Sequence, residues 1–386
     1  MFRLILVLSL LYGTASAQSA DERLRLGYAA FEMGDGKLAV RLLDPLAEAG
    51  DKYAQYAVAE TLLAGRDVPR DLPRATALFQ KAAGQDIPAA QTRIGTAYFY
   101  GDFVPKNIDT ALQWFERGAR NGHAAAQTNL AVMYADGIGV RRDPARAVAL
   151  LQEALPRGEA NTFNTLANAY SRGAGVAQDK VKAVALYRQA AEMGSTVAMD
   201  NLGNVYRDGH GVSKDYTEAR GWYEKAAAMS EPKSLNNLGV MYLKGLGVTR
   251  DTKKAGDYFR MAAQRSEADA EFNLGLMFLH GEGHDVDHDI GTRWMALAAA
   301  HGSENAQAYM VVLADSKHAV QEDRKMLSGY SNHLGAQGSA PTQRLIAELF
   351  DSGRFVPRNR NEAKRWFVLA ARQGDALAAA RLKSFD

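Results

Sequence analysis

The feature that most constrains this chain is a sequence period of 36 residues that runs almost from end to end. One phase of the period is always aspartate or asparagine: Asp35, Asp71, Asn107, Asp143, Asp179, Asp215, Asp251, Asp287, Asp323 and Asn359. Another phase is always large and apolar: Leu42, Leu78, Trp114, Leu150, Leu186, Trp222, Tyr258, Trp294, Tyr330 and Trp366. Such self-similarity is typical of repeat proteins, whose units bury their apolar faces only by stacking on neighbours.

One unit, from Asn237 to Ala263, shows what each repeat is expected to contain. Leu238 and Tyr242 are four residues apart, so they share one face of a first helix. Gly245 follows where that helix must end, because glycine readily adopts the left-handed backbone needed there. Asp251 is placed to cap a second helix with its short carboxylate. The inner face of that helix is predicted to hold Ala255, Tyr258, Phe259, Ala262 and Ala263. Each repeat is therefore predicted to be a helical hairpin.

The same sequence pattern recurs in other repeats. Residues 126–134 read Ala-Gln-x-Asn-Leu-Ala-x-x-Tyr, and residues 137–143 read Gly-x-Gly-Val-x-x-Asp. This pattern resembles the Sel-one-like repeat (SLR) family, whose members are related to tetratricopeptide repeats. The resemblance implies an all-α fold, a right-handed α/α superhelical solenoid of about ten 36-residue helix pairs. It also implies a surface that binds other proteins, without catalytic residues.

The N-terminal residues differ from the repeats. Arg3 precedes an apolar run, and Ala15-Ser16-Ala17 has the form of a signal-peptidase site. The run is shorter than the ~20 residues that span a bilayer, so we expect a cleaved signal peptide over residues 1–17, with an uncleaved N-terminal helix as the alternative. The chain has no cysteine for lipid attachment or disulfides. We therefore expect a periplasmic or secreted protein without membrane insertion after cleavage.

The charge balance argues against a polyanionic partner. Lysine and arginine total 46, against 44 aspartate and glutamate residues. Nothing in that balance suggests a nucleic acid or an anionic membrane surface as the partner. Another protein or a peptide, of unknown identity, is the expected partner.

The repeat phase also predicts how residues 18–386 are organised. We expect an N-terminal cap over 21–50, regular repeats over 51–302, a degenerate repeat over 303–338, a last repeat over 339–374 and a closing helix over 375–386. In the degenerate repeat Lys317 replaces the turn glycine. This repeat either still stacks or forms a bend or a partner-specific surface. Trp114, Trp222 and Trp294 are each expected to anchor one contact between helices.

The first helices of the repeats carry a polar stripe that is a candidate binding groove. Positions three and seven residues after the repeated asparagine share its side of the helix. The candidate groove residues are Asn129, Asn168, Arg172, Asn201, Asn204, Asp208, Asn237, Lys244 and Asn273. Asparagine both donates and accepts, so a ladder of such side chains can hydrogen-bond an extended peptide backbone. Alternatively, these amides stabilise the contact between adjacent helices.

A second candidate site is the loop from His280 to Asp289. Its candidate metal ligands are His280, His284, Asp285 and His288. Imidazole and carboxylate suit zinc, copper or manganese. The alternatives are a solvated acidic turn, in which Asp287 is only a helix cap, and a pH-sensitive patch. The sequence indicates no cofactor.

Enzymatic motifs are nearly absent from the sequence. One Ser-x-x-Lys occurs at Ser230, without the companion motifs of penicillin-binding enzymes. We therefore expect a non-catalytic scaffold or adaptor that binds an envelope protein or peptide on its concave face. Family members suggest a regulator of periplasmic signalling or a scaffold of polysaccharide export. The alternatives are a cell-wall or β-lactam-active enzyme and a metal-binding periplasmic protein.

Overall fold

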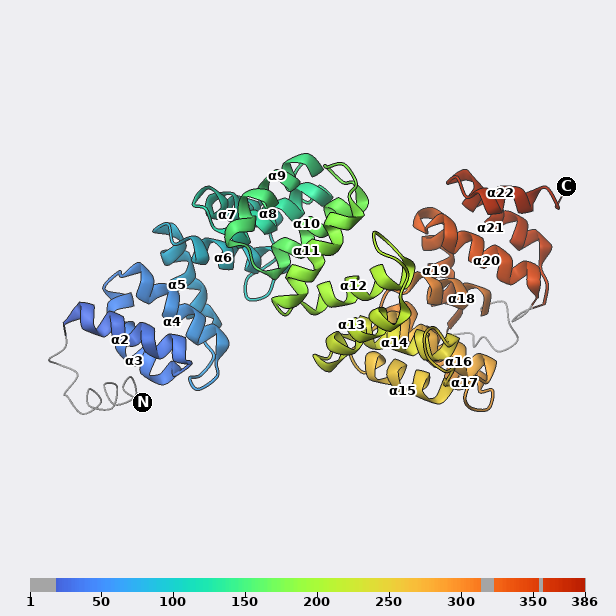
Figure 1. Ribbon diagram of the computed structural model, residues 1–386, viewed down its shortest axis with the longest axis horizontal. Helices are drawn as coiled ribbons and strands as arrows, with labels where there is room; N and C mark the ends of the chain where they lie inside the picture. The colour runs from blue at the N-terminus through green and yellow to red at the C-terminus, as the bar shows by residue number, and fades with distance from the viewer. Residues whose placement is uncertain (1–18, 314–322, 354–356, 386) are drawn as a thin grey trace. The chain divides into compact units, whose positions relative to one another are not determined.

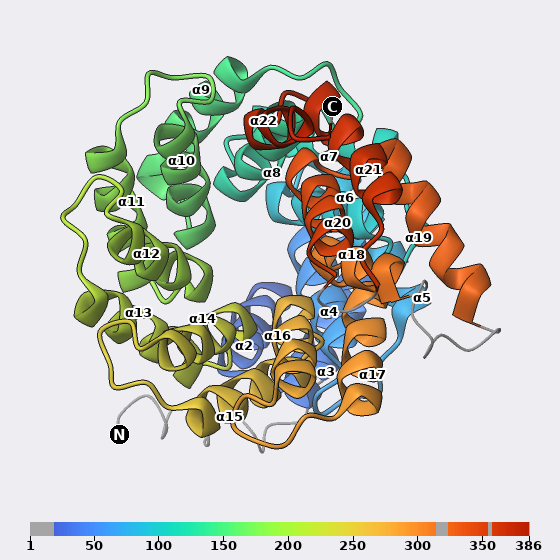
Figure 2. The ribbon, with the colours of Figure 1, turned by 90° about the vertical axis from the view of Figure 1, so that its right-hand side faces the viewer.

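The structure is a computed structural model that describes residues 19–313, 323–353 and 357–385, and its regular elements in these ranges are helices (Figures 1 and 2). The chain divides into two compact units, Met1–Ser195 and Thr196–Asp386. The first contains α2 (Ala20–Met33), α3 (Gly36–Glu48), α4 (Lys52–Ala64), α5 (Leu72–Gly84), α6 (Pro88–Tyr100), α7 (Ile108–Arg120), α8 (Ala124–Asp136), α9 (Pro144–Ala154), the short 3-10 helix η1 (Leu155–Arg157), α10 (Ala160–Arg172) and α11 (Lys180–Glu192). The second contains α12 (Thr196–Asp208), α13 (Tyr216–Ala228), α14 (Pro232–Lys244), α15 (Thr252–Ala263), α16 (Ala268–His280), α17 (His288–Ala300), α18 (Glu304–Leu313), α19 (Asp323–Gln337), α20 (Ala340–Ser352), α21 (Arg360–Arg372) and α22 (Ala376–Leu382).

Within each unit, consecutive helices pack as pairs, and each pair packs on the next. This confirms the all-α repeat solenoid. We call the first helix of each pair the A helix and the second the B helix. In these terms, α4, α6, α8 and α10 are A helices of the first unit, and α12, α14, α16, α18 and α20 are A helices of the second. The signal peptide predicted for residues 1–17 lies outside the described residues.

The capping column begins the B helices as predicted. Each described member accepts a hydrogen bond from a backbone N–H in the first turn of its helix, as Asp251 does from Lys254 at 2.9 Å. The members that do so are Asp35, Asp71, Asn107, Asp143, Asp179, Asp215, Asp251, Asp287 and Asn359. The side chain of Asp323 is outside the described part. The turn glycines also behave as predicted, because Gly245 ends α14 with a φ of 68°. Lys317 lies outside the described residues.

The tryptophans of the first apolar column are not the most deeply buried residues, although Trp114 and Trp294 pack against buried clusters of neighbouring helices, as expected of contacts between helices. Trp114, Trp222 and Trp294 are only half-buried. The residue that follows each of them is buried instead, as are its equivalents in most repeats: Leu43, Phe79, Phe115, Leu151, Tyr187, Tyr223, Phe259, Met295 and Phe367. The B helix turns this second column toward its own A helix. Trp366 differs from the other tryptophans, since it is fully buried.

A small residue on the A helix makes room for that core side chain. A Cβ added to Gly239 would lie 2.5 Å from Cε1 of Phe259, and one added to Gly203 would lie 2.3 Å from Cε1 of Tyr223. Where the core residue is Leu151, the position equivalent to Gly239 is Ala131, and both residues are buried. The glycine in the Leu-Gly pattern therefore serves close packing of the two helices of one repeat.

The repeat over 303–338 reverses this arrangement. Its A helix carries Val311 at the small position, and its B helix carries Ser331 at the large one. Val311 belongs to a buried cluster with Leu334 of α19 and with Ile346 and Ala347 of α20. This packing of α18 directly on α20 favours the interpretation that the degenerate repeat still stacks.

Candidate functional site

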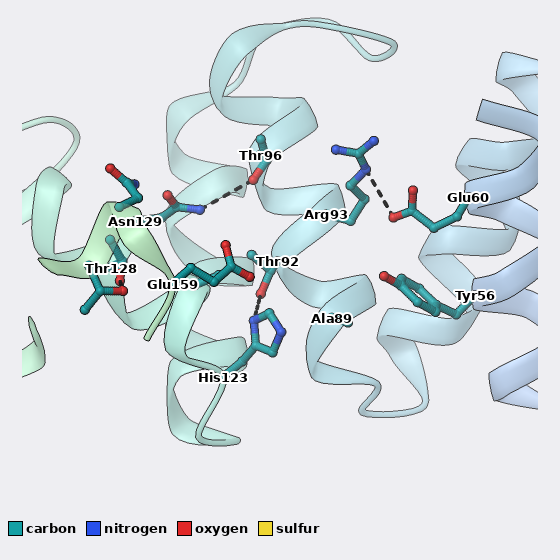
Figure 3. Close-up of a pocket in the computed structure, with 13 residues that line it drawn as sticks. Tyr56, Glu60, Ala89, Thr92, Arg93, Thr96, His123, Thr128, Asn129 and Glu159 are labelled. Atoms are coloured by element: carbon teal, nitrogen blue, oxygen red, sulfur yellow. Dashed lines mark hydrogen bonds and ion pairs between the residues drawn. The ribbon is translucent and has the colours of Figure 1, made fainter. Parts of the chain in front are cut away.

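The A helices of the first unit form a polar pocket of about 320 Å³ (Figure 3). Its lining comes from α4, α6, α8 and α10 and from the residues that precede the last two. The lining residues are Tyr56, Glu60, Ala89, Thr92, Arg93, Thr96, His123, Ala125, Thr128, Asn129, Glu159, Asn161 and Thr162. Because successive A helices repeat at one spacing, their equivalent side chains meet on one surface.

An ion pair closes one side of the pocket. Nε of Arg93 lies 3.3 Å from Oε1 of Glu60, and both side chains point into the space between α4 and α6 in Figure 3. Burial raises the pKa of Glu60, although Arg93 and a hydrogen bond from Tyr56 oppose that shift. Burial also raises the pKa of Tyr56 to about 12. The charges of Glu60 and Arg93 balance, and the terminal nitrogens of Arg93 have no hydrogen-bond partner among the described residues.

A threonine–histidine pair fixes the central polar group. Oγ1 of Thr92 donates to the carbonyl oxygen of Pro88 at 2.9 Å, and it lies 2.7 Å from Nδ1 of His123. The hydroxyl has one hydrogen, so both contacts are satisfied when Nδ1 of His123 donates to Thr92. Nε2 of the neutral ring is then an acceptor. Burial lowers the pKa of His123, which favours this neutral form at pH 7.

The far side of the pocket is lined by hydrogen-bonding threonine and asparagine side chains, with the carboxylate of Glu159 at its rim. Thr128 donates to the Ala124 carbonyl, so at 2.8 Å Thr162 is the donor to Thr128. Nδ2 of Asn129 reaches Thr96 only at 3.5 Å, which leaves most of the amide's hydrogen-bonding capacity open. The threonine, asparagine, histidine and arginine side chains of the pocket thus offer hydrogen-bond donors and acceptors to a ligand. This arrangement of hydrogen-bonding groups can bind a polar chain.

In the second unit, two predicted groove residues converge on one buried carboxylate. Asp200 accepts from Ser234 at 2.8 Å, from Nδ2 of Asn237 at 2.9 Å and from Nδ2 of Asn204 at 3.0 Å. Burial raises the pKa of Asp200 above its ordinary value, and these three hydrogen bonds oppose the shift. Tyr223 donates to Oδ1 of Asn204 at 2.8 Å. This network joins α12 to α13 and α14.

The other predicted groove residues also make contacts between helices or lie at helix ends. Tyr187 donates to Asn168 at 2.6 Å, and Asn273 donates to Asn236 at 2.8 Å. Nε and Nη2 of Arg207 each donate a hydrogen bond to the carboxylate of Asp208 at 2.8 Å. The exposed residues at the ends of their helices are Arg172, Asp208 and Lys244. Asn201 is half-buried on α12. Several of these amides therefore join neighbouring helices, and peptide binding by this set stays a prediction.

The sequence interpretation missed the column one residue before the repeated asparagine. Its members are Thr92, Thr128, Asn164, Asp200 and Asn236, and all are polar and buried. Side chains of this column make hydrogen bonds between successive repeats. Examples are the Thr92–His123 pair and the bond between Asn236 and Asn273. The 36-residue spacing of the members in the sequence is a pattern from which this column could have been predicted.

The histidine loop does not gather its four predicted ligands. The ring of His284 stacks on Phe278 at 3.9 Å between centroids, and its Nδ1 lies 2.9 Å from the carbonyl oxygen of Asp285. In the ranges that the structure describes, no group of three His, Asp or Glu side chains is placed to hold a metal ion. Metal binding by His280, His284, Asp285 and His288 stays a prediction.

The Sel1 repeat family model matches eight segments that together cover more than half of the chain. These are residues 52–86, 88–123, 124–155, 166–195, 196–231, 232–266, 268–303 and 340–375. Residues 304–339, which include most of the degenerate repeat, carry no match. A comparison with curated proteins gave no match.

Two solved structures share the fold. One is c5321, described as a protective antigen present in uropathogenic Escherichia coli strains and displaying an SLR fold. It is 26% identical with a TM-score of 0.57, over 95% of this chain and 80% of that one. The other is a Sel1 repeat protein from Oxalobacter formigenes, 28% identical with a TM-score of 0.55, over 63% of this chain and 98% of that one. Separately, no helix within the described ranges is both long and apolar enough to cross a bilayer.

Proposed function

This chain belongs to the Sel1 repeat family, and from that premise we propose that it is a non-catalytic adaptor that binds an extended segment of another protein in the A-helix pocket of its first unit. The observation that carries the proposal is the convergence of polar side chains from α4, α6, α8 and α10 on one cavity of about 320 Å³. Sel1 repeats suggest a protein partner.

The pocket chemistry favours a peptide backbone over a charged small molecule. Glu60 and Arg93 balance each other, and His123 is favoured in its neutral form. Asn129, Asn161 and the terminal nitrogens of Arg93 can pair with the alternating N–H and C=O groups of an extended strand, whatever its side chains. Glu159 is exposed at the rim, and its carboxylate adds attraction for a lysine or arginine of the bound segment.

We place this adaptor in the bacterial envelope, as a regulator of signalling or a scaffold of polysaccharide export. Support for export comes from the signal-peptide pattern of residues 1–17. Mass spectrometry of the protein recovered from its native cells tests it, with Gln18 expected as the first residue. Recovery only of a chain that begins at Met1 would contradict export.

A site-specific crosslinking experiment tests the binding proposal. A photoreactive amino acid replaces Thr96, which lines the pocket, or Gln113, which is exposed on α7 of the same repeat. Irradiation of cells is expected to link one discrete protein to position 96 and not to position 113. An absence of crosslinks at 96, or the same products at both positions, would contradict the proposal.

The same pocket is tested with a blocking variant. Ala125→Trp places a large side chain in the pocket without removing a hydrogen-bonding group, and Ala149→Trp adds the same bulk on the exposed side of α9. The first change is expected to abolish the crosslink at position 96, and the second to preserve it. Hydrolysis of nitrocefin or peptidoglycan by the purified protein would instead support the enzyme alternative.

A further inference from the structure

The second unit has a different hollow, between the B helices α19 and α21. It has a volume of about 640 Å³. Its lining is Ser331, Asn332, Gly335, Ala336, Asn361, Lys364, Arg365, Val368, Leu369 and Arg372. We call this hollow the B-helix groove. It is formed by other helices, in the other unit, than the pocket of the proposed function.

The side chains that α19 contributes to the groove are small. Ser331 occupies the position that holds Phe367 in the next repeat and Met295 in the preceding one. Gly335 and Ala336 are also small. Meanwhile α18 packs directly on α20, with Val311 in the shared cluster, so stacking does not require α19 to fill the space beside α21. The small side chains of α19 therefore line a hollow on the surface, while the core is completed by contacts between α18 and α20.

The lining combines an apolar floor with a cationic rim. Val368 and Leu369 are half-buried, whereas Lys364, Arg365 and Arg372 are exposed. No carboxylate is among the lining residues. Arg365 contacts Glu362 of its own helix at 3.2 Å, but both side chains are solvent-accessible, and such pairs contribute little. A ligand carboxylate can therefore compete for this guanidinium.

We propose that the B-helix groove binds a segment of a partner protein in which acidic side chains flank an apolar one. The apolar side chain packs on Val368 and Leu369, which are partly exposed to water without it. Carboxylates on either side pair with the rim, where arginine can hold a carboxylate with two parallel hydrogen bonds. Charge complementarity between the rim and the segment selects the partner and speeds its association.

Fluorescence anisotropy with the full chain tests this proposal. The probe is a labelled short peptide of repeated Glu-Glu-Leu units, and the comparison probe has Lys in place of Glu. Only the acidic peptide is expected to bind, and its affinity is expected to fall as salt is added because salt screens the rim charges. Lys364→Glu/Arg372→Glu is expected to weaken binding by about tenfold or more.

Matched variants separate the groove from net charge. Lys233→Glu/Lys253→Glu makes the same charge change at two exposed sites of the second unit that do not line the groove, and it is expected to leave binding unchanged. Circular dichroism checks that each variant is folded. If the charge-reversed groove variant is unfolded, Lys364→Gln/Arg372→Gln is expected to show the weakening, and wild-type affinity in that variant would overturn the proposal.

Other outcomes would also overturn it. These are equal binding of the acidic and lysine peptides, equal weakening in the control variant, and tighter binding of a labelled oligonucleotide or of anionic lipid vesicles at the same groove. Blocking the first-unit pocket with Ala125→Trp is expected to leave the acidic peptide bound. A failure of the proposed function would therefore be distinguishable from a failure of this inference.

Discussion

Nδ1 of His301 lies 2.8 and 2.9 Å from the two carboxylate oxygens of Glu271, which is only 1% exposed. Three other repeats make a contact between neutral amides at these positions: Asn121 donates to Gln91 at 3.0 Å, and Gln85 donates to Gln55 and Gln373 to Gln343 at 2.9 Å. The Glu271–His301 contact is thus an ionisable pair at the place where these three repeats have an amide pair. Its role is to hold the end of a B helix against its own A helix.

Removal of one member of this pair is expected to destabilise the second unit. His301→Ala leaves a buried carboxylate without its partner, at a cost of about 1–3 kcal/mol in the free energy of unfolding. Glu271→Gln/His301→Gln recreates the amide pair of the siblings and is expected to lose less than His301→Ala does. Urea denaturation of the three proteins measures this. A double variant as unstable as His301→Ala would show that the pair is not equivalent to the amide ladder.

A larger side chain at the close contact between α14 and α15 is expected to lower the free energy of unfolding. Gly239→Ala drives a methyl group against the ring of Phe259, with a destabilisation of about 1–3 kcal/mol. Gly221→Ala is the matched control, because it is also helical and a Cβ there meets nothing within 4 Å. It is expected to be stabilising by about 0.5–1 kcal/mol. Thermal denaturation compares the two, and equal melting temperatures would contradict this packing account.

Loss of a helix cap is expected to lower the stability by a smaller amount. The size of the loss is expected to depend on whether the replacing side chain can still cap the helix. Asp251→Ala removes the acceptor for the Lys254 N–H and is expected to cost about 0.5–2 kcal/mol. Asp251→Asn keeps a cap of the kind that Asn107 and Asn359 provide, so it is expected to stay near wild type. Urea denaturation measures both variants. If they lose the same stability, charge rather than capping would explain the repeated aspartate.

The buried Asp200 predicts a definite dependence on pH. Its pKa is raised in the folded protein by burial, so the folded state binds its proton more tightly than the unfolded state does. Its contribution to stability is therefore fully present below the ordinary aspartate pKa and is lost as pH rises through the raised value. Unfolding free energies of wild type and Asp200→Asn, measured from pH 3 to pH 8, are expected to show wild type losing stability relative to the variant as pH rises. A constant difference would contradict the raised pKa.

Local features of the fold could be predicted from the sequence because they depend on single residues. Asp251 and Gly245 begin and end helices through their own side-chain or backbone chemistry. The inner face was predicted to include both adjacent large positions, but not which of the two is the more buried: Trp222 is half-buried and Tyr223 is buried. Only the partner helix decides which of the two faces inward, through the space left by Gly203.

The candidate site was predictable only in outline. The polar stripe indicated which helix face to consider, and it included Asn129 of the pocket. The Thr92–His123 pair could not be predicted in the same way, because His123 comes from the residue before α8 and contacts a different helix. The B-helix groove depends on how α19 packs, which the repeat phase does not determine.

The account rests on the claim that the A-helix pocket binds an extended segment of a partner protein. Once crosslinking at position 96 has identified that segment, titration calorimetry of a synthetic peptide of the same sequence tests the claim most directly. The account predicts that Ala125→Trp weakens binding by about tenfold or more while Ala149→Trp binds like wild type. Equal affinities of the peptide for wild type and for Ala125→Trp would contradict it.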